Sequence, residues 1–196
     1  MDRETKKYID GLDIGSIPWN RMFTAYGTAE NYAGLLQELG EIRDLGQWKK
    51  TFSRISDFEH QSTMFPPAPF ALVFLVRILR KLIEDGDADD IAAKLIDQFT
   101  YYADVCSDAE EMEHAEPLGS FEDLLDDGNL LPEDPTEDDL MAVYEDPDAV
   151  PPELFYSFYY FSKMVLSLVP DILDACGRFP AESRELRKKT EGASDA

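Results

Sequence analysis

Residues 70–83 read FALVFLVRILRKLI, a segment that is apolar on nearly every side until Arg77. A helix that is apolar all round is buried, because a surface helix carries a polar face. Pro66, Pro67 and Pro69 precede the segment and interrupt any earlier helix. We therefore expect a central, buried helix here, with the rest of the chain arranged around it.

The segments on both sides of this run repeat the apolar spacing of α-helices. The apolar positions before it are Tyr32, Leu35, Leu36, Leu39 and Ile42, and those after it are Ile91, Leu95, Phe99 and Tyr102. A last apolar stretch runs from Leu154 to Cys176 and contains Pro170, where we expect a kink. No sustained alternating pattern indicates a sheet. The sequence predicts an all-α fold in a single domain, residues 1–196.

The negative charge of the chain is concentrated in one third of its length. The formal net charge is −23 over 196 residues, with 41 acidic and 18 basic residues. Residues 95–162 hold 20 of the acidic residues and no Lys or Arg, so the remainder of the chain carries a net charge of about −3. This window also contains many Pro and Gly residues, which predicts a loop-rich acidic insertion at about 104–150.

Two interpretations of this acidic insertion stay open. Its apolar residues can anchor it to the helical frame, so that its carboxylates form a surface for a partner. Alternatively, the insertion is a solvated loop without a partner, as most charge runs are. The tail at about 181–196 is basic, then polar, and we expect it to fray.

The composition excludes some partners and favours others. A strongly acidic chain is repelled by nucleic acids and by anionic membrane faces, so we expect neither direct nucleic-acid binding nor membrane binding. The first ten residues, MDRETKKYID, lack the apolar run of a signal peptide, and we expect a cytoplasmic protein. The favoured partner is a cationic protein, whose encounter with the chain would be accelerated by long-range attraction.

The sequence offers no constellation for catalysis. Histidine occurs only at His60 and His114; the first lies between helical segments, and carboxylates surround the second without a known metal spacing. Phosphate-binding glycine loops and the GxSxG motif are missing. We therefore expect no enzyme activity, no catalytic residue, no metal and no cofactor, and a structural role for His60 in joining neighbouring helices.

Two groups of motifs resemble a group of bacterial HEAT-like α-helical repeat proteins. The first group is Ile17-Pro18-Trp19, Tyr26-Gly27-Thr28-Ala29 and Leu35-Leu36, and the second is His60-Gln61-Ser62-Thr63 before the apolar run at 70–79. The resemblance covers about residues 14–83, and Ser62 replaces the family's Gly. It implies a HEAT-like stack of helical hairpins. We also expect structural roles for Trp19, Tyr26, Gly27, His60 and Gln61.

Related proteins are associated with immunity against secreted polymorphic toxins, so the resemblance implies an immunity protein that occludes a toxin with a basic active-site cleft. The alternative is a nucleic-acid-mimicking inhibitor, of the phage anti-defence type, of a DNA- or RNA-binding protein. For either function we expect partner contacts from the acidic insertion. The predicted contact residues are Glu110, Glu111, Glu113, Glu116, Phe121, Glu122, Asp123, Leu124, Asp126, Asp127, Leu130, Glu133, Asp134, Glu137, Asp138, Asp139 and Tyr144.

Overall fold

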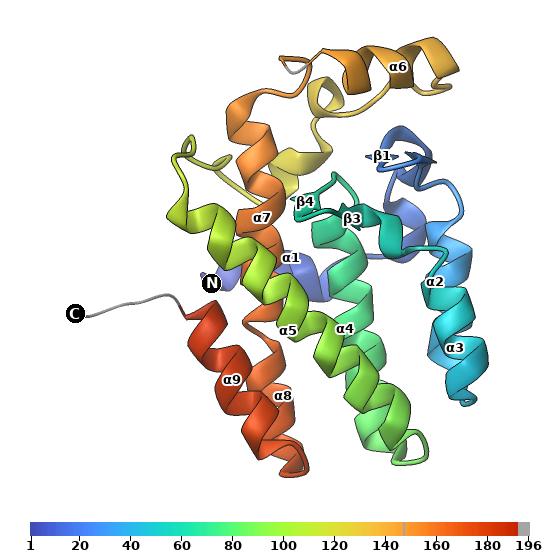
Figure 1. Ribbon diagram of the computed structural model, residues 1–196, viewed down its shortest axis with the longest axis vertical. Helices are drawn as coiled ribbons and strands as arrows, with labels where there is room; N and C mark the ends of the chain where they lie inside the picture. The colour runs from blue at the N-terminus through green and yellow to red at the C-terminus, as the bar shows by residue number, and fades with distance from the viewer. Residues whose placement is uncertain (147, 192–196) are drawn as a thin grey trace.

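The computed structural model describes residues 1–146 and 148–191. Its larger elements are α-helices, which confirms the predicted all-α fold (Figure 1). In chain order these helices are α1 (Arg3–Gly11), α2 (Tyr32–Glu41), α3 (Leu45–Phe52), α4 (Ala68–Asp85), α5 (Asp89–Glu111), α6 (Glu137–Glu145), α7 (Pro152–Leu166), α8 (Val169–Cys176) and α9 (Pro180–Thr190).

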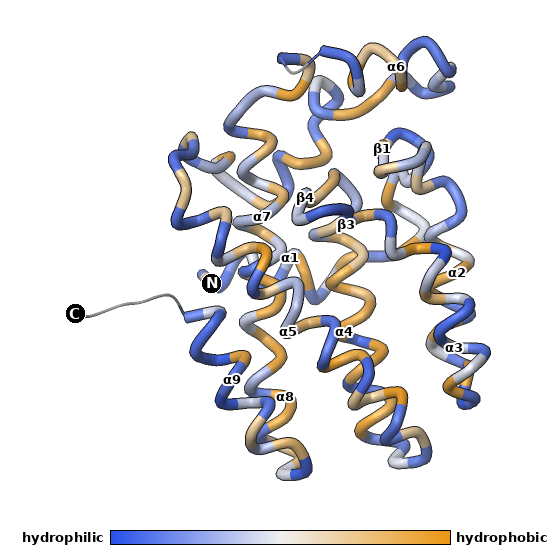
Figure 2. The backbone as a smooth tube through the Cα atoms, in the orientation of Figure 1, coloured by the Kyte–Doolittle hydropathy of each residue, from blue (hydrophilic) through white to orange (hydrophobic). Residues whose placement is uncertain are grey.

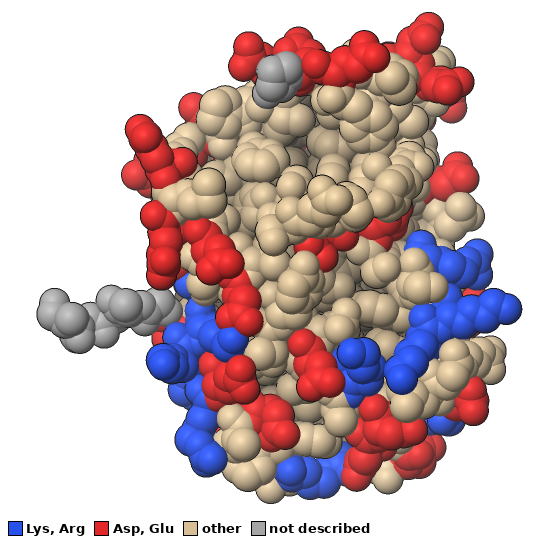
Figure 3. Space-filling view, in the orientation of Figure 1, with Lys and Arg blue, Asp and Glu red and all other residues tan. Residues whose placement is uncertain are grey.

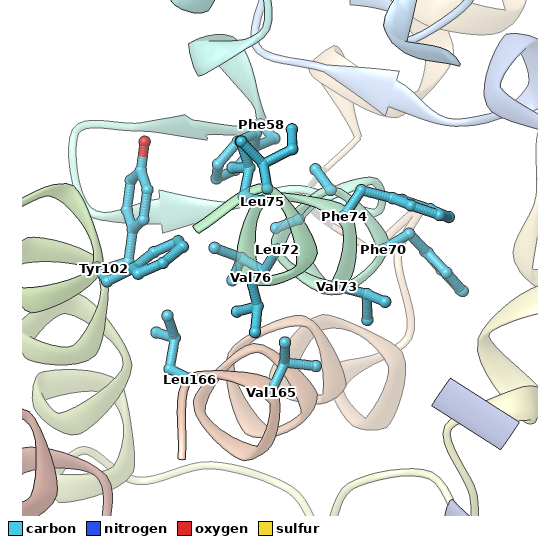
Figure 4. Packing of buried hydrophobic residues seen from close by; sticks show 14 of the residues in the cluster. Phe58, Phe70, Leu72, Val73, Phe74, Leu75, Val76, Tyr102, Val165 and Leu166 are labelled. Carbon is cyan, nitrogen blue, oxygen red and sulfur yellow. The ribbon is translucent and has the colours of Figure 1, made fainter. Parts of the chain in front are cut away.

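Helix α4 is the central helix that the apolar run at 70–83 predicts. Every residue from Ala68 to Val76 is buried, and α4 contacts α2, α5 and α7. Figure 4 shows side chains of α4 facing Val165 and Leu166 of α7. The polar face begins at Arg77, whose guanidinium donates to the carbonyl oxygens of Ile9 and Leu12 and so joins α1 to α4.

The remaining helices form pairs that stack on both sides of the pair α4–α5. Helix α4 contacts α2 and α7 in one row, and α5 contacts α3 and α9 in a second row (Figure 1). The buried apolar residues form one continuous core, and Figure 2 shows that apolar residues recur along each of these helices. This arrangement is a stack of helical hairpins, as expected from the sequence.

The apolar stretch at the end of the chain divides into two helices near Pro170. Helix α7 ends at Leu166 and α8 begins at Val169, with Pro170 in the first turn of α8. A proline ring clashes with the carbonyl group four residues earlier, which here belongs to Leu166. The predicted kink is therefore a complete break between two helices.

Two predicted boundaries are wrong. Helix α5 continues to Glu111, so residues 104–111 belong to the helical stack and the acidic insertion begins at Met112. The tail does not fray from 181, because α9 buries Leu186 against α5 and α8, and Lys189 pairs with Asp104. These contacts join residues far apart in the chain, and the weak apolar spacing of α9 does not reveal them.

Two short hairpins and several 3₁₀ turns interrupt the helical pattern. A 3₁₀ turn, η2 (Trp19–Arg21), is followed by β1 (Phe23–Thr24) and β2 (Gly27–Thr28), which pair antiparallel. A second hairpin joins β3 (Glu59–His60) to β4 (Thr63–Met64). The other 3₁₀ turns are η1 (Ile14–Ser16), η3 (Ser56–Phe58), η4 (Glu122–Leu125) and η5 (Asp127–Asn129).

Candidate partner-binding surface

The acidic insertion is attached to the N-terminal part of the chain through η2. The amide of Leu131 donates to the carbonyl oxygen of Arg21 at 2.9 Å, and Nε of Arg21 donates to the carbonyl oxygen of Leu131 at 2.6 Å. A second guanidinium nitrogen of Arg21 pairs with Asp127 at 2.7 Å. The side chain of Asn20 donates to the carbonyl oxygen of Glu133 at 2.8 Å. The insertion is thus fixed in position by several directed hydrogen bonds.

Phe121 and Leu124 belong to the core, so their prediction as partner contacts is wrong. The ring of Phe121 is 1% exposed and lies edge-on to Phe70 and Phe161, with centroids 5.2 and 5.4 Å apart. Leu124 is also buried, and Leu130 is half-buried against the same core. The apolar side chains of a charged segment are drawn into the core by the free energy of burying them, which removes them from a partner's reach.

Tyr144 fastens α6 to the first hairpin. Its hydroxyl donates to the carbonyl oxygen of Thr24 at 2.8 Å, and its ring lies edge-on to Phe23 with centroids 6.4 Å apart. Partial burial raises the pKa of Tyr144, so the hydroxyl remains a donor at neutral pH. The side chain is nevertheless 41% exposed, so Tyr144 also presents an aromatic surface to solvent.

The two hairpins are held together by Asp57. Its carboxylate accepts hydrogen bonds from the hydroxyls of Thr24 at 2.7 Å and Tyr32 at 2.6 Å, and its carbonyl oxygen accepts one from the amide of Ala25 at 3.0 Å. Burial, and next the Asp57 charge, raise the pKa of Tyr32. These bonds make the hairpins a fixed support beneath α6.

A groove of about 620 Å³ lies between α6, the β3–β4 hairpin and the start of α7. Its volume is in the range of about 300–1,000 Å³ that is usual for ligand pockets. Most of its lining is apolar, and the carboxylates of Glu145 and Asp146 lie at the end formed by α6. The lining residues of this apolar groove are Phe23, Thr63, Met64, Phe65, Val143, Tyr144, Glu145, Asp146, Val150, Pro152, Phe155 and Phe158.

The charges of the molecule are segregated around this groove. Figure 3 shows Asp and Glu along the end that carries α6, an uncharged surface beside them, and Lys and Arg, mixed with further Asp and Glu, toward the opposite end. Among the described residues, the exposed members of the predicted contact set that form no ion pair are Glu111, Glu113, Glu116, Glu122, Asp126, Glu133, Asp134, Glu137 and Asp138.

The other predicted acidic residues have partners within the chain. Besides Asp127, Glu110 is paired, with Lys163 at 2.5 Å. Asp123 and Asp139 accept hydrogen bonds from main-chain N–H groups three residues earlier, and these bonds stabilise η4 and the first turn of α6. Asp123, Asp127 and Asp139 therefore stabilise the insertion, whereas Glu110 joins α5 to α7. All four carboxylates are less available to a partner.

His60 is structural in a different way from the one we expected. It lies on β3, where its ring is 5.1 Å from that of Tyr26 and its nitrogens are 3.2 Å from the Tyr26 hydroxyl. It therefore joins the two hairpins by a side-chain contact, and Tyr26 itself is mostly exposed.

The other predicted structural residues also lie at or near the hairpins. Trp19 is buried, and its indole N–H donates to the carbonyl oxygen of Ile14. The turn after His60 begins at Gln61. Gly27 has φ +150°, in the region that favours glycine.

His114 lies flat against Tyr156, with ring centroids 3.6 Å apart, and its Nδ1 is 2.8 Å from the carbonyl oxygen of Ala115. Within residues 1–146 and 148–191, no group of three or more His, Cys, Asp or Glu side chains is placed to hold a metal ion.

Comparison of the chain with family models, curated proteins and solved structures gives no match. The resemblance to HEAT-like repeat proteins therefore rests on the sequence motifs alone. In the described part of the chain, every helix is too short or too polar to cross a membrane.

The sequence did not identify the apolar half of the candidate surface. Met64, Phe65 and Phe155 line the groove, but each lies in a segment that is otherwise part of the core. Phe155 is 43% exposed although its neighbours in α7 are largely buried. The continuous apolar run at Leu154–Phe161 predicts a buried helix, so the sequence carried no signal for the exposure of Phe155.

Proposed function

We propose that this chain is an immunity-type inhibitor that binds a cationic protein, a secreted bacterial toxin domain, and blocks its active-site cleft. The observation that supports this proposal is the combination of the apolar groove with neighbouring exposed carboxylates, which belong to an insertion that is rigidly attached to the helices. Binding surfaces of proteins commonly combine a desolvated apolar centre with a polar rim.

The two parts of the surface have different physical tasks. The exposed carboxylates of the insertion attract a basic cleft over several ångströms and orient it, which mainly raises the association rate. The groove accepts apolar side chains and releases its water, which mainly slows dissociation. Because hydrogen bonds from Arg21 and Tyr144 already hold the insertion in place, little conformational entropy is lost on binding.

A nucleic-acid-mimicking inhibitor is the alternative function. Such a mimic presents carboxylates at regular, phosphate-like spacing. The apolar groove beside the charges has no counterpart in a nucleic-acid backbone, and this favours the protein-binding proposal.

The proposal can be tested by co-expressing this chain with toxin domains encoded beside its gene. We expect rescue of growth by this chain, and a tight complex of the two purified proteins whose association rate falls steeply as NaCl increases. Lack of rescue for every neighbouring toxin, together with displacement of DNA or RNA from a nucleic-acid-binding protein, would instead establish the alternative.

A further inference from the structure

This inference rests on the proposed function and specifies the partner's chemistry. We propose that the apolar groove receives an apolar side chain of the partner that is flanked in sequence by Lys or Arg. The apolar side chain enters between Phe65, Tyr144 and Phe155, and the cation binds at the C-terminal end of α6, where Glu145 and Asp146 line the same groove.

The apolar part of the argument comes from Phe155 and Tyr144. Both side chains line the groove, and both are more than two-fifths exposed to solvent. Exposed aromatic surface in a groove gains free energy when a second apolar group covers it, by about 25 cal/mol for each Å² removed from water. Large aromatic residues are also frequent among the residues that dominate binding energy.

The charged part of the argument comes from the end of α6. The last carbonyl groups of a helix carry a partial negative charge, which is stabilised by cations and destabilised by anions. Here Glu145 occupies the last turn and Asp146 follows it, and that turn has no basic residue. Among the described residues neither carboxylate forms an ion pair.

Two carboxylates and the partial negative charge of the helix end therefore meet at one end of the groove without a cation among the described residues. The main-chain amide of Asp148 donates a hydrogen bond to Asp146 at 2.9 Å but carries no positive charge. Residues 95–162 contain no Lys or Arg, so the insertion itself provides no cation to this end. A Lys or Arg of the partner removes the repulsion and places the neighbouring apolar side chain over the groove. This charge complementarity selects a basic, apolar segment over an acidic or a purely polar one.

Three synthetic peptides of equal length are suitable probes: one of Leu and Lys, one of Leu and Glu, and one of Ser and Lys. Their binding to the ¹⁵N-labelled full chain is followed by chemical-shift changes. We expect the Leu–Lys peptide to bind at least tenfold more tightly than the others, with its largest shifts at Met64, Tyr144 and Asp146. Equal binding of the Ser–Lys peptide, no binding of the Leu–Lys peptide, or shifts only at sites outside the groove overturns the inference.

Two double variants that each remove two negative charges show whether peptide binding depends on the position of the charges or only on the total charge. Glu145→Gln with Asp146→Asn should weaken binding of the Leu–Lys peptide at least tenfold. Glu137→Gln with Asp138→Asn removes the same charge from the other end of α6 and should weaken it no more than about threefold, because exposed charges beyond about 10 Å are screened at 0.1 M salt. Equal losses for the two variants contradict the groove site but leave the proposed function standing. If the full chain captures no toxin encoded beside its gene, the proposed function fails as well.

Discussion

At the scale of single residues, the turn between β3 and β4 is locally strained. Gln61 and Ser62 have φ values of +51° and +63°, in the left-handed region where side chains clash with the backbone. A two-residue hairpin turn with both central residues in this region is the type that favours Asn-Gly. The hairpin is retained because its neighbours hold it: the amide of Ser62 donates to Glu59, and Tyr159 donates to the carbonyl oxygen of Ser62.

Replacement of Ser62 by Gly should therefore stabilise the protein. Glycine adopts positive φ without a steric cost, and we expect the free energy of unfolding to rise by about 1 kcal/mol, measured by urea denaturation. Ser62→Ala is the matched control, because alanine keeps the strain of the turn. An increase of the same size in the control would show that φ is not the cause.

Phe121 and Phe155 should respond oppositely to truncation. Phe121→Ala leaves a cavity between buried rings and should destabilise the fold by about 3–5 kcal/mol. Phe155→Ala removes a largely accessible ring and should cost much less stability while weakening partner binding. Thermal unfolding and peptide binding, measured on both variants, distinguish the two roles. If the Phe121→Ala protein is as stable as the original and has lost only partner binding, Phe121 contacts the partner and the core assignment is wrong.

At the scale of elements, α6 depends on a reciprocal cap at its first turn. The side chain of Thr136 accepts from the amide of Asp139, and the Asp139 carboxylate accepts from the amide and hydroxyl of Thr136 at 2.8 and 2.6 Å. The hydroxyl and then the amide hydrogen bond from Thr136 hold the pKa of Asp139 below its usual value. The cap is therefore complete while this carboxylate is ionised.

Stability from this cap should be lost in acid. Because the folded pKa lies below the unfolded one, the contribution is fully present above about pH 4 and disappears as the pH falls through the folded pKa. The protection of the α6 amides against hydrogen exchange, taken relative to the intrinsic exchange rate at each pH, should fall over that range. Asp139→Asn should lack this particular pH dependence, and identical profiles for the two proteins would contradict the assignment.

The attachment of the insertion depends on the guanidinium group of Arg21, which bonds Leu131 and Asp127 through two different nitrogens. Arg21→Lys keeps the charge but cannot bond the Leu131 carbonyl and Asp127 at once. A hydrogen bond that involves a charged group contributes about 1.5–3 kcal/mol, so the amide of Leu131 should exchange about ten- to a hundredfold faster. The amide of Leu75 in α4 should be unaffected. Unchanged exchange at Leu131 would mean that the buried side chains alone hold the insertion.

At the scale of the whole molecule, charge of one sign lies over one end of a neutral stack. Self-repulsion within such a region destabilises the compact state, and salt screens it. Raising NaCl from about 0.02 to about 0.5 M should therefore raise Tm by a few degrees. A variant with Gln at Glu111, Glu113, Glu116 and Glu122 should show a smaller rise. An equal rise of Tm in the two proteins would mean that these four glutamates are not the source of the charge repulsion.

The sequence by itself predicted the long apolar helices and where the charge lies. The apolar run at 70–83 has no polar face, so it could only become a buried helix, and the absence of Lys and Arg from 95–162 is a property of composition. The apolar spacing of a helix indicates which side avoids water, but not which residue covers that side.

The tertiary structure alone decided which apolar residues are core and which are surface. Phe121, inside an acidic segment, is buried by contacts with residues about 40–50 positions away, whereas Phe155, inside an apolar helix, is left exposed. The groove likewise combines Phe23, Met64 and Tyr144 from three distant segments. Burial depends on which surfaces meet when the helices pack, and those long-range contacts are not encoded in any local pattern of the chain.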